Sequence, residues 1–100
     1  MRIISKGTLV ACWSRHSDSK EQLLHWHNIA EKEKWKSPNE VKESFPNVSI
    51  LPNNRIVFNI KGNDYRFVAY IVYTLSILYI CWVGSHSEYD KIDANTIWDN

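Results

Sequence analysis

The sequence predicts an α+β fold, in which a small antiparallel sheet carries helices on one face, and two observations support this prediction. Apolar residues recur at helical spacing up to Phe45, whereas from Val48 onward they alternate with a period of two. Short turn-forming segments such as Pro52-Asn53-Asn54 separate the later apolar runs. Strands joined by short turns pair antiparallel, so the helices that precede them must cover one face of the sheet.

The first half of the chain is expected to be helical after a short opening strand. Ser17-Asp18 is expected to cap the second helix, and Ser37 with Glu40 forms a capping-box pattern for the third, which Pro46 ends. The elements predicted here are a strand at residues 1–5 and helices at residues 6–13, 19–35 and 37–45.

The second half is expected to form strands, followed by a short capped helical turn from Ser85 and a frayed tail. The predicted strands cover residues 48–51, 55–60, 64–73 and 77–83. The uncharged run from Phe67 to Val83 also reaches the lower edge of the length that spans a bilayer as a helix. Its β-branched and aromatic residues, with Thr74 and Ser76 near the middle, favour a buried hairpin over a membrane helix.

The composition indicates one soluble domain, residues 1–100, that acts in the cytoplasm. The chain is 44% hydrophobic and 23% charged, which excludes a disordered or fibrous protein. Its formal charge of +1 predicts no general attraction to nucleic acid, so such a partner must be recognised locally. Cys12 and Cys81 follow no metal or redox spacing, and we expect both thiols to be free.

Alternation along the last two strands divides their side chains between two faces. Arg66 shares a face with Val68 and Tyr70, and Cys81 lies on that open face in the neighbouring strand. Gly84, Ser85 and His86 follow directly, so a histidine is placed at the edge of the sheet near an arginine. The core expected on the other face consists of Phe67, Ile71, Leu78, Ile80 and Trp82, packed against Leu23, Leu24 and Ile29.

The sequence lacks the patterns of several enzyme classes. His25 and His27 project to different sides of a helix and are not expected to bind zinc. The chain has no glycine-rich phosphate loop, nucleophile elbow or metalloprotease motif. We therefore expect no metal and no cofactor.

Three segments, WKSPNEVK at residues 35–42, VFNIKGNDYR at residues 57–66 and VGSHSEYDKIDA at residues 83–94, closely resemble the HigB toxins of the RelE superfamily. The resemblance implies a RelE-like fold and a toxin that cuts translated mRNA on the ribosome. It also implies a HigA antitoxin partner of the helix-turn-helix type, and no membrane partner.

Metal-free RNA cleavage needs stabilised phosphoryl charge and proton transfer to and from ribose oxygens. We assign Arg66 to the phosphate, His86 to acid or base chemistry, and Tyr89 to orienting the nucleotide. The candidate backbone-phosphate contacts are Lys36, Arg55 and Lys61.

Cys81 departs from the family pattern. HigB relatives usually have Tyr-Ile-Arg-Phe-Val-Gly where this chain has Tyr79-Ile80-Cys81-Trp82-Val83-Gly84, so the arginine expected beside Arg66 is absent. Loss of one preorganised charge-stabilising group costs on the order of a hundredfold in rate. The sequence therefore also allows an alternative function, a catalytically inactive module of the same fold that binds the antitoxin.

Overall fold

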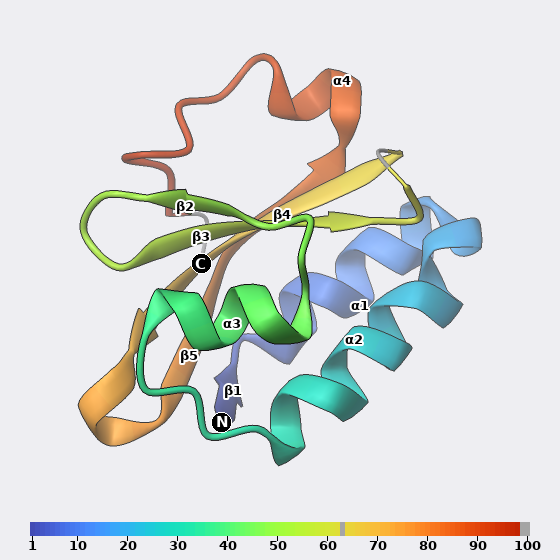
Figure 1. Ribbon diagram of the computed structural model, residues 1–100. Coiled ribbons are helices and arrows are strands. Elements are labelled where there is room, and N and C mark those ends of the chain that lie inside the picture. The colour runs from blue at the N-terminus through green and yellow to red at the C-terminus, as the bar shows by residue number, and fades with distance from the viewer. Residues whose placement is uncertain (63, 99–100) are drawn as a thin grey trace.

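A computed structural model of the protein describes residues 1–62 and 64–98 and confirms the α+β fold (Figure 1). In chain order, the elements are β1 (Arg2–Ile4), α1 (Lys6–Arg15), the 3-10 turn η1 (Ser17–Ser19), α2 (Lys20–Lys32), α3 (Pro38–Ser44), β2 (Ser49–Leu51), β3 (Arg55–Ile60), β4 (Tyr65–Val72), the 3-10 turn η2 (Tyr73–Leu75), β5 (Ile77–Ser85) and α4 (His86–Tyr89).

The five strands form one sheet in the order β1-β5-β4-β3-β2. Strands β2 to β5 pair antiparallel with their sequence neighbours, as the short turns predict. Strand β1 lies parallel to β5, with Arg2 opposite Ile77, so the complete sheet is mixed. A parallel partner at this edge is possible because helices and the other strands separate β1 from β5 along the chain.

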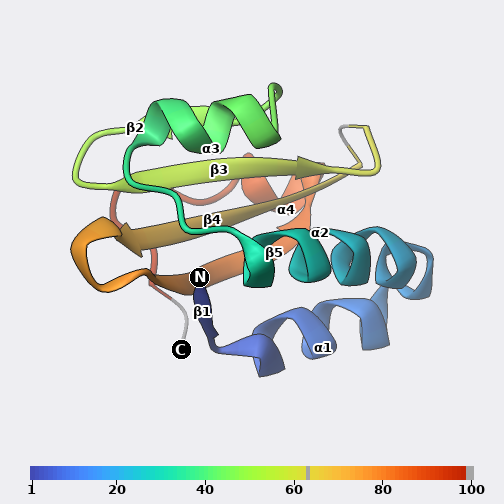
Figure 2. The same ribbon diagram turned by 60° about the horizontal axis from the view of Figure 1, so that its bottom comes forward.

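Helices α1, α2 and α3 cover one face of the sheet (Figure 2). The core on this face is aromatic at its centre, where the Trp26 ring lies 4.5 Å from Phe67 and 5.3 Å from Phe58 between ring centroids. The expected core positions Leu23, Phe67, Ile71, Leu78 and Ile80 are all fully buried. Leu24 and Ile29 are only half-buried, because the α2 residues that face the sheet are Leu23, Trp26 and Ala30.

The start of α2 differs from the prediction. Ser17–Ser19 forms a 3-10 turn, and Ser19, at the N-cap position, makes no side-chain cap. Asp18 instead accepts hydrogen bonds from Tyr65 and Lys61. These partners are distant in sequence, so the Asp18 carboxylate does not cap the helix as its spacing predicted. The third helix matches its pattern, since the Ser37 hydroxyl accepts from the Glu40 backbone N–H.

The apolar run from Phe67 to Val83 forms most of β4 and β5, which confirms the buried hairpin. Its connection contains η2 and ends at Ser76, which adopts the left-handed conformation with φ of 54°. A serine therefore fills a turn position where Gly or Asn would be expected. Across residues 1–62 and 64–98, no helix has the length and apolar character needed to cross a membrane.

A β-bulge changes which side chains of β5 face the helices. Val68 pairs with Trp82 and Ala69 with Ile80, so Cys81 is the extra residue. The bulge moves Trp82 to the face opposite the helices, where it packs with Val68 and Cys81. The prediction that Trp82 joins Leu78 and Ile80 in the helix-side core was therefore wrong, whereas Cys81 does lie on the face of Arg66.

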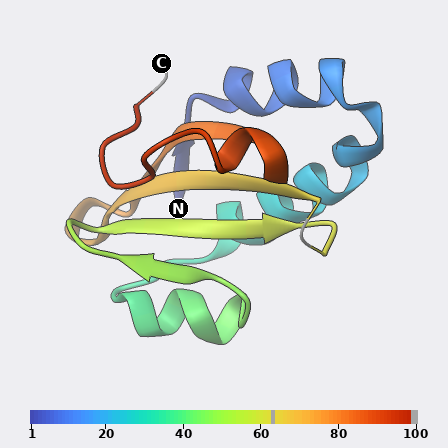
Figure 3. The ribbon, with the colours of Figure 1, turned by 90° about the horizontal axis from the view of Figure 1, so that it is seen from above.

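That second face is covered rather than open. Helix α4 and the segment after it, residues 90–98, cross over β4 and β5 (Figure 3). Ala94 is buried there and Ile92 and Ile97 pack beside it, so the described part of the predicted frayed tail forms a second apolar layer. We call residues 90–98 the C-terminal segment.

Arg55 holds this segment in place. Its side chain is 8% exposed, and Nη1 donates to the carbonyl oxygens of Ala94 at 3.3 Å and Ile97 at 2.6 Å. The Trp98 ring lies over the guanidinium, with 5.6 Å from Cζ to the ring centroid. Arg55 is thus engaged inside the protein.

We predict that Arg55→Ala lowers the free energy of unfolding by about 2–3 kcal/mol, because it removes charged hydrogen bonds to two carbonyls of the C-terminal segment. Urea unfolding followed by tryptophan fluorescence measures this change. Arg2→Ala, at an exposed position on β1, is the matched control and should change stability by no more than about 0.5 kcal/mol. Equal effects of the two substitutions would contradict the assigned role of Arg55.

Candidate functional site

Arg66 and Tyr89 form the centre of a candidate site at one end of the sheet. Arg66 lies opposite Gly84 where β4 begins and β5 ends. Its guanidinium carbon lies 4.9 Å from the centroid of the Tyr89 ring, a cation–π contact. Arg66 Nε is shielded from solvent and has no hydrogen-bond partner among the described residues. The structure therefore brings together two of the residues assigned to catalysis.

A capping box fixes the helical turn that carries Tyr89. The Ser85 hydroxyl accepts from the Glu88 backbone N–H at 3.2 Å, and Glu88 Oε1 accepts from the Ser85 backbone N–H at 2.8 Å. That backbone hydrogen bond is the main reason why the pKa of Glu88 lies below its usual value. Glu88 is thus a fixed, ionised carboxylate at neutral pH.

His86 begins α4 but faces a different part of the site from Tyr89. It lines a shallow depression at the end of the sheet, together with His16, Asp64, Tyr65, Ser85 and Ser87. Its Nε2 lies 3.5 Å from Asp90 Oδ2, and its backbone N–H donates to the Asp64 carbonyl at 3.0 Å. We call this the end-of-sheet depression. Arg66 and Tyr89 are not among the residues that line it.

The sequence reasoning missed His16, which follows α1 and reaches the same depression. Its Nε2 lies 3.6 Å from Glu88 Oε1, and its ring centroid lies 5.3 Å from that of Tyr65. No spacing rule connects His16 with His86, because only the tertiary fold joins the end of α1 to the end of β5. A lone histidine after a helix gave no signal by itself.

Lys61 is already paired with acidic side chains of the protein. Its Nζ lies 2.9 Å from Asp18 Oδ2 and 4.0 Å from Asp64 Oδ2, and the hydrogen bond with Asp18 raises the lysine pKa. Asp18 also accepts from the Tyr65 hydroxyl, which raises the pKa of Tyr65 to about 12, while the bonds from Tyr65 and Lys61 lower that of Asp18. Lys61 follows β3 and lies at the same end of the sheet as Arg66. Its ion pairs with Asp18 and Asp64 partly neutralise its charge.

Arg55 and Cys81 are buried on the second face of the sheet, beneath the C-terminal segment. Arg55 donates hydrogen bonds to the C-terminal segment, which occupies the guanidinium that the sequence suggested for backbone phosphate. Cys81 is fully buried at the bulge, and burial is the main cause that raises its pKa. Neither Cys81 nor Cys12 forms a disulfide in the part of the chain that the structure describes.

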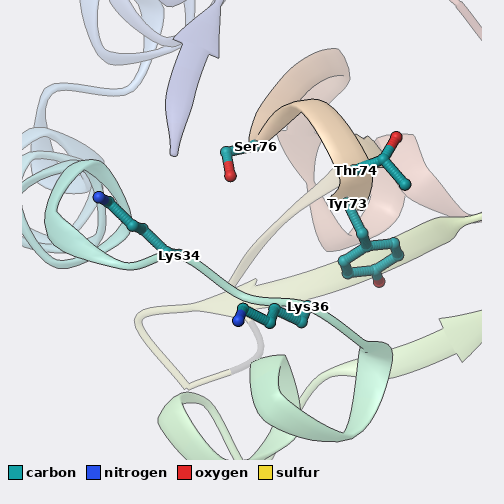
Figure 4. A pocket seen from close by; sticks show the side chains of 5 residues that line it. All are labelled: Lys34, Lys36, Tyr73, Thr74 and Ser76. Atoms are coloured by element: carbon teal, nitrogen blue, oxygen red, sulfur yellow. The ribbon is translucent and has the colours of Figure 1, made fainter.

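Lys36 lies at the opposite end of the sheet from His86. It lines a pocket beside η2 with Lys34, Tyr73, Thr74 and Ser76 (Figure 4). This pocket adjoins the start of β5, whereas His86 follows its end, so roughly 25 Å of strand separates them. Burial raises the pKa of Tyr73 to about 12. Lys36 therefore does not belong to the end-of-sheet site.

The assembled groups suit chemistry on a phosphodiester. A guanidinium recognises phosphate oxygens, an aromatic ring stacks on a base, and imidazoles exchange protons near neutral pH. Arg66, Tyr89, His86 and His16 provide these groups from three separate parts of the chain.

Comparison with known proteins identifies the family of the chain. Residues 19–92 match the profile of a family described as HigB toxin, the RelE-like toxic component of a toxin–antitoxin system. The chain belongs to this HigB toxin family. As the toxic component of such a system, it has an antitoxin as its partner.

Relatives in enteric bacteria match nearly the whole chain. The mRNA interferase HigB of Escherichia coli O6:H1 is 27% identical over 94 residues, which cover 92% of this chain and 91% of the relative. The mRNA interferase toxin HigB of Escherichia coli K12 is 29% identical over 96 residues, which cover 94% and 92%. The mRNA interferase HigB of Shigella flexneri matches to the same extent.

We predict that Glu88→Ala lowers the free energy of unfolding by about 1 kcal/mol at pH 7, because it removes half of the capping box. The folded-state pKa of Glu88 is lowered, so its stabilisation is present above the unfolded pKa and disappears as pH falls through the folded value. The difference between wild type and variant should therefore shrink below about pH 4. Urea unfolding at several pH values measures it, with the exposed Glu43→Ala as control. A difference that stays constant down to pH 2 would contradict this assignment.

Proposed function

We propose that this protein is the toxin of a HigBA-type system and cuts mRNA in the cytoplasm, on the translating ribosome. Its membership of the HigB family and its likeness to relatives named mRNA interferases support an endoribonuclease. The Arg66–Tyr89 pair beside the end-of-sheet depression is the observation that carries the proposal. Residues suited to phosphate recognition, base stacking and proton transfer lie at one end of the sheet, which supports the proposal.

Cleavage begins when a base removes the proton of the ribose 2′-hydroxyl and the oxygen attacks the adjacent phosphorus. Arg66 stabilises the charge that develops on the phosphoryl oxygens, because a planar guanidinium suits phosphate oxygens. Tyr89 positions the nucleotide by stacking. His86 takes part in the proton transfer. The products are a 2′,3′-cyclic phosphate and a free 5′-hydroxyl.

The distribution of charge supports dependence on the ribosome. The net charge is +1, Arg55 is buried against carbonyls, and Lys61 is paired with Asp18. Affinity for RNA depends on cations that neutralise phosphates, so this chain should bind free RNA weakly. A ribosome that presents the mRNA would position the RNA at the site, which the weak charge of this protein does not do alone. The proposed antitoxin is a HigA-type helix-turn-helix protein.

Removal of His86 or Arg66 is predicted to slow cleavage on the order of 10²-fold or more, because each group acts on the transition state. The variants His86→Gln and Arg66→Gln are added to purified ribosomes that translate a defined message. The rate at which cut mRNA ends appear measures cleavage. His25→Gln, at an exposed position on α2, is the control and should cut like wild type.

Two outcomes would contradict the proposal. Equal cutting with and without ribosomes would exclude ribosome dependence. No cutting by wild type on translating ribosomes, together with binding of the antitoxin, would favour the inactive antitoxin-binding module.

Cys81→Arg separates these two functions further. Cys81 is fully buried, and Arg55 lies close enough to affect its thiol, so a second guanidinium there would be crowded and repelled. We predict a loss of about 1–3 kcal/mol in unfolding free energy and no gain in cutting. Urea unfolding measures the loss of stability. Bacterial growth after induction of the variant shows whether it has gained cutting activity. If Cys81→Arg becomes toxic while wild type only binds the antitoxin, the inactive module is correct.

A further inference from the structure

We propose that His16 is a second catalytic residue of this site and donates the proton that the departing 5′-oxygen requires, while His86 accepts the proton of the 2′-hydroxyl. This inference rests on the proposed endoribonuclease function and assigns the second proton transfer within it.

Two histidines line the end-of-sheet depression from elements distant in the sequence. His16 ends α1 and His86 begins α4, and the same shallow surface lies between them. The histidine side chains are 31% and 46% exposed, so both are accessible to a substrate. In-line displacement at phosphorus needs a proton removed on one side and supplied on the other, which two separate imidazoles can do.

Each histidine has its own carboxylate partner. His16 Nε2 lies 3.6 Å from Glu88 Oε1, and His86 Nε2 lies 3.5 Å from Asp90 Oδ2. A carboxylate beside one ring nitrogen orients the imidazole. The depression thus carries two imidazole–carboxylate pairs.

The two pairs differ in a way that assigns the roles. Glu88 is fixed by the Ser85 backbone N–H and remains ionised, so protonated His16 gains a permanent ion-pair partner. The groups that face His16 are Glu88 from α4 and Tyr65 from β4, and Asp64 and His86 line the same depression. Asp90, the partner of His86, is 62% exposed and therefore holds its imidazole less firmly. The firmly held ring of His16 is therefore assigned to the acid role, and the less constrained ring of His86 to the base role.

The step is balanced without a cofactor. His86 takes the 2′-hydroxyl proton as the bond from the 2′-oxygen to phosphorus forms. The bond from phosphorus to the 5′-oxygen breaks, and the 5′-oxygen takes the proton of His16. The enzyme is left with protonated His86 and neutral His16, and exchange with water restores the starting state.

A leaving group that needs no proton tests this assignment. Ribosomes are programmed with a message whose scissile 5′-oxygen is replaced by sulfur, because a thiolate departs without an acid. His16→Gln should cut the oxygen message on the order of 10²-fold more slowly than wild type and the sulfur message at nearly the wild-type rate. His86→Gln should be slow on both messages. The control, His25→Gln, should match wild type on both.

Several results would overturn the inference. If His16→Gln cuts the oxygen message like wild type, His16 takes no part in the reaction. If it is equally slow on both messages, His16 has only a structural role. Wild-type protein gives an independent measurement, since the fall in rate at high pH should occur with the oxygen message and be absent with sulfur. Failure of wild type to cut either message would instead reject the proposed function itself.

Discussion

The pairing of β4 with β5, and the bulge within it, is the constraint on which the site depends. Because Cys81 is an extra residue, Trp82 turns to the second face and Gly84 comes opposite Arg66. A Cβ at Gly84 would lie 2.7 Å from the Trp82 ring and 2.8 Å from Glu88 Oε1, so only glycine allows this close packing. Helix α4 therefore begins directly beside Arg66, with Tyr89 under the guanidinium. The bulge, the glycine and the capping box together position the Arg66–Tyr89 contact.

The second apolar layer explains why Arg55 is engaged inside the protein. Helix α4 has only four residues and cannot stay in place by its own hydrogen bonds. The C-terminal segment packs against the same face and is tied to the sheet by Arg55. An arginine that would otherwise be free for phosphate thus stabilises the fold. At position 81 a small buried thiol packs beneath that layer.

Local patterns in the sequence predicted most of the elements and the face on which Arg66 lies, and tertiary effects account for the differences. Period-two alternation placed Arg66 and Cys81 on one face, and the Ser85–Glu88 spacing predicted the helical turn that carries Tyr89. Alternation assumes one residue per pairing position, so it could not show the bulge that moves Trp82. The cap assigned to Asp18 was wrong because Tyr65 and Lys61 compete for its carboxylate. Likewise, no local pattern could show His16 near His86, since their proximity arises only when α1 packs beside the end of β5.

The proposed role of His16 has an electrostatic consequence for the site. Transition-state charge on phosphorus requires compensating positive charge close by, and in this chain Lys61 is paired and Arg55 is buried. An imidazole that enters the reaction protonated carries both a proton and a positive charge. In the proposed mechanism, His16 therefore supplies part of the positive charge that the transition state needs. The positive charge of His16 disappears when its proton is transferred. It can therefore stabilise the reaction only until the bond to the 5′-oxygen breaks. Arg66 remains charged throughout and holds the phosphate before and after that step.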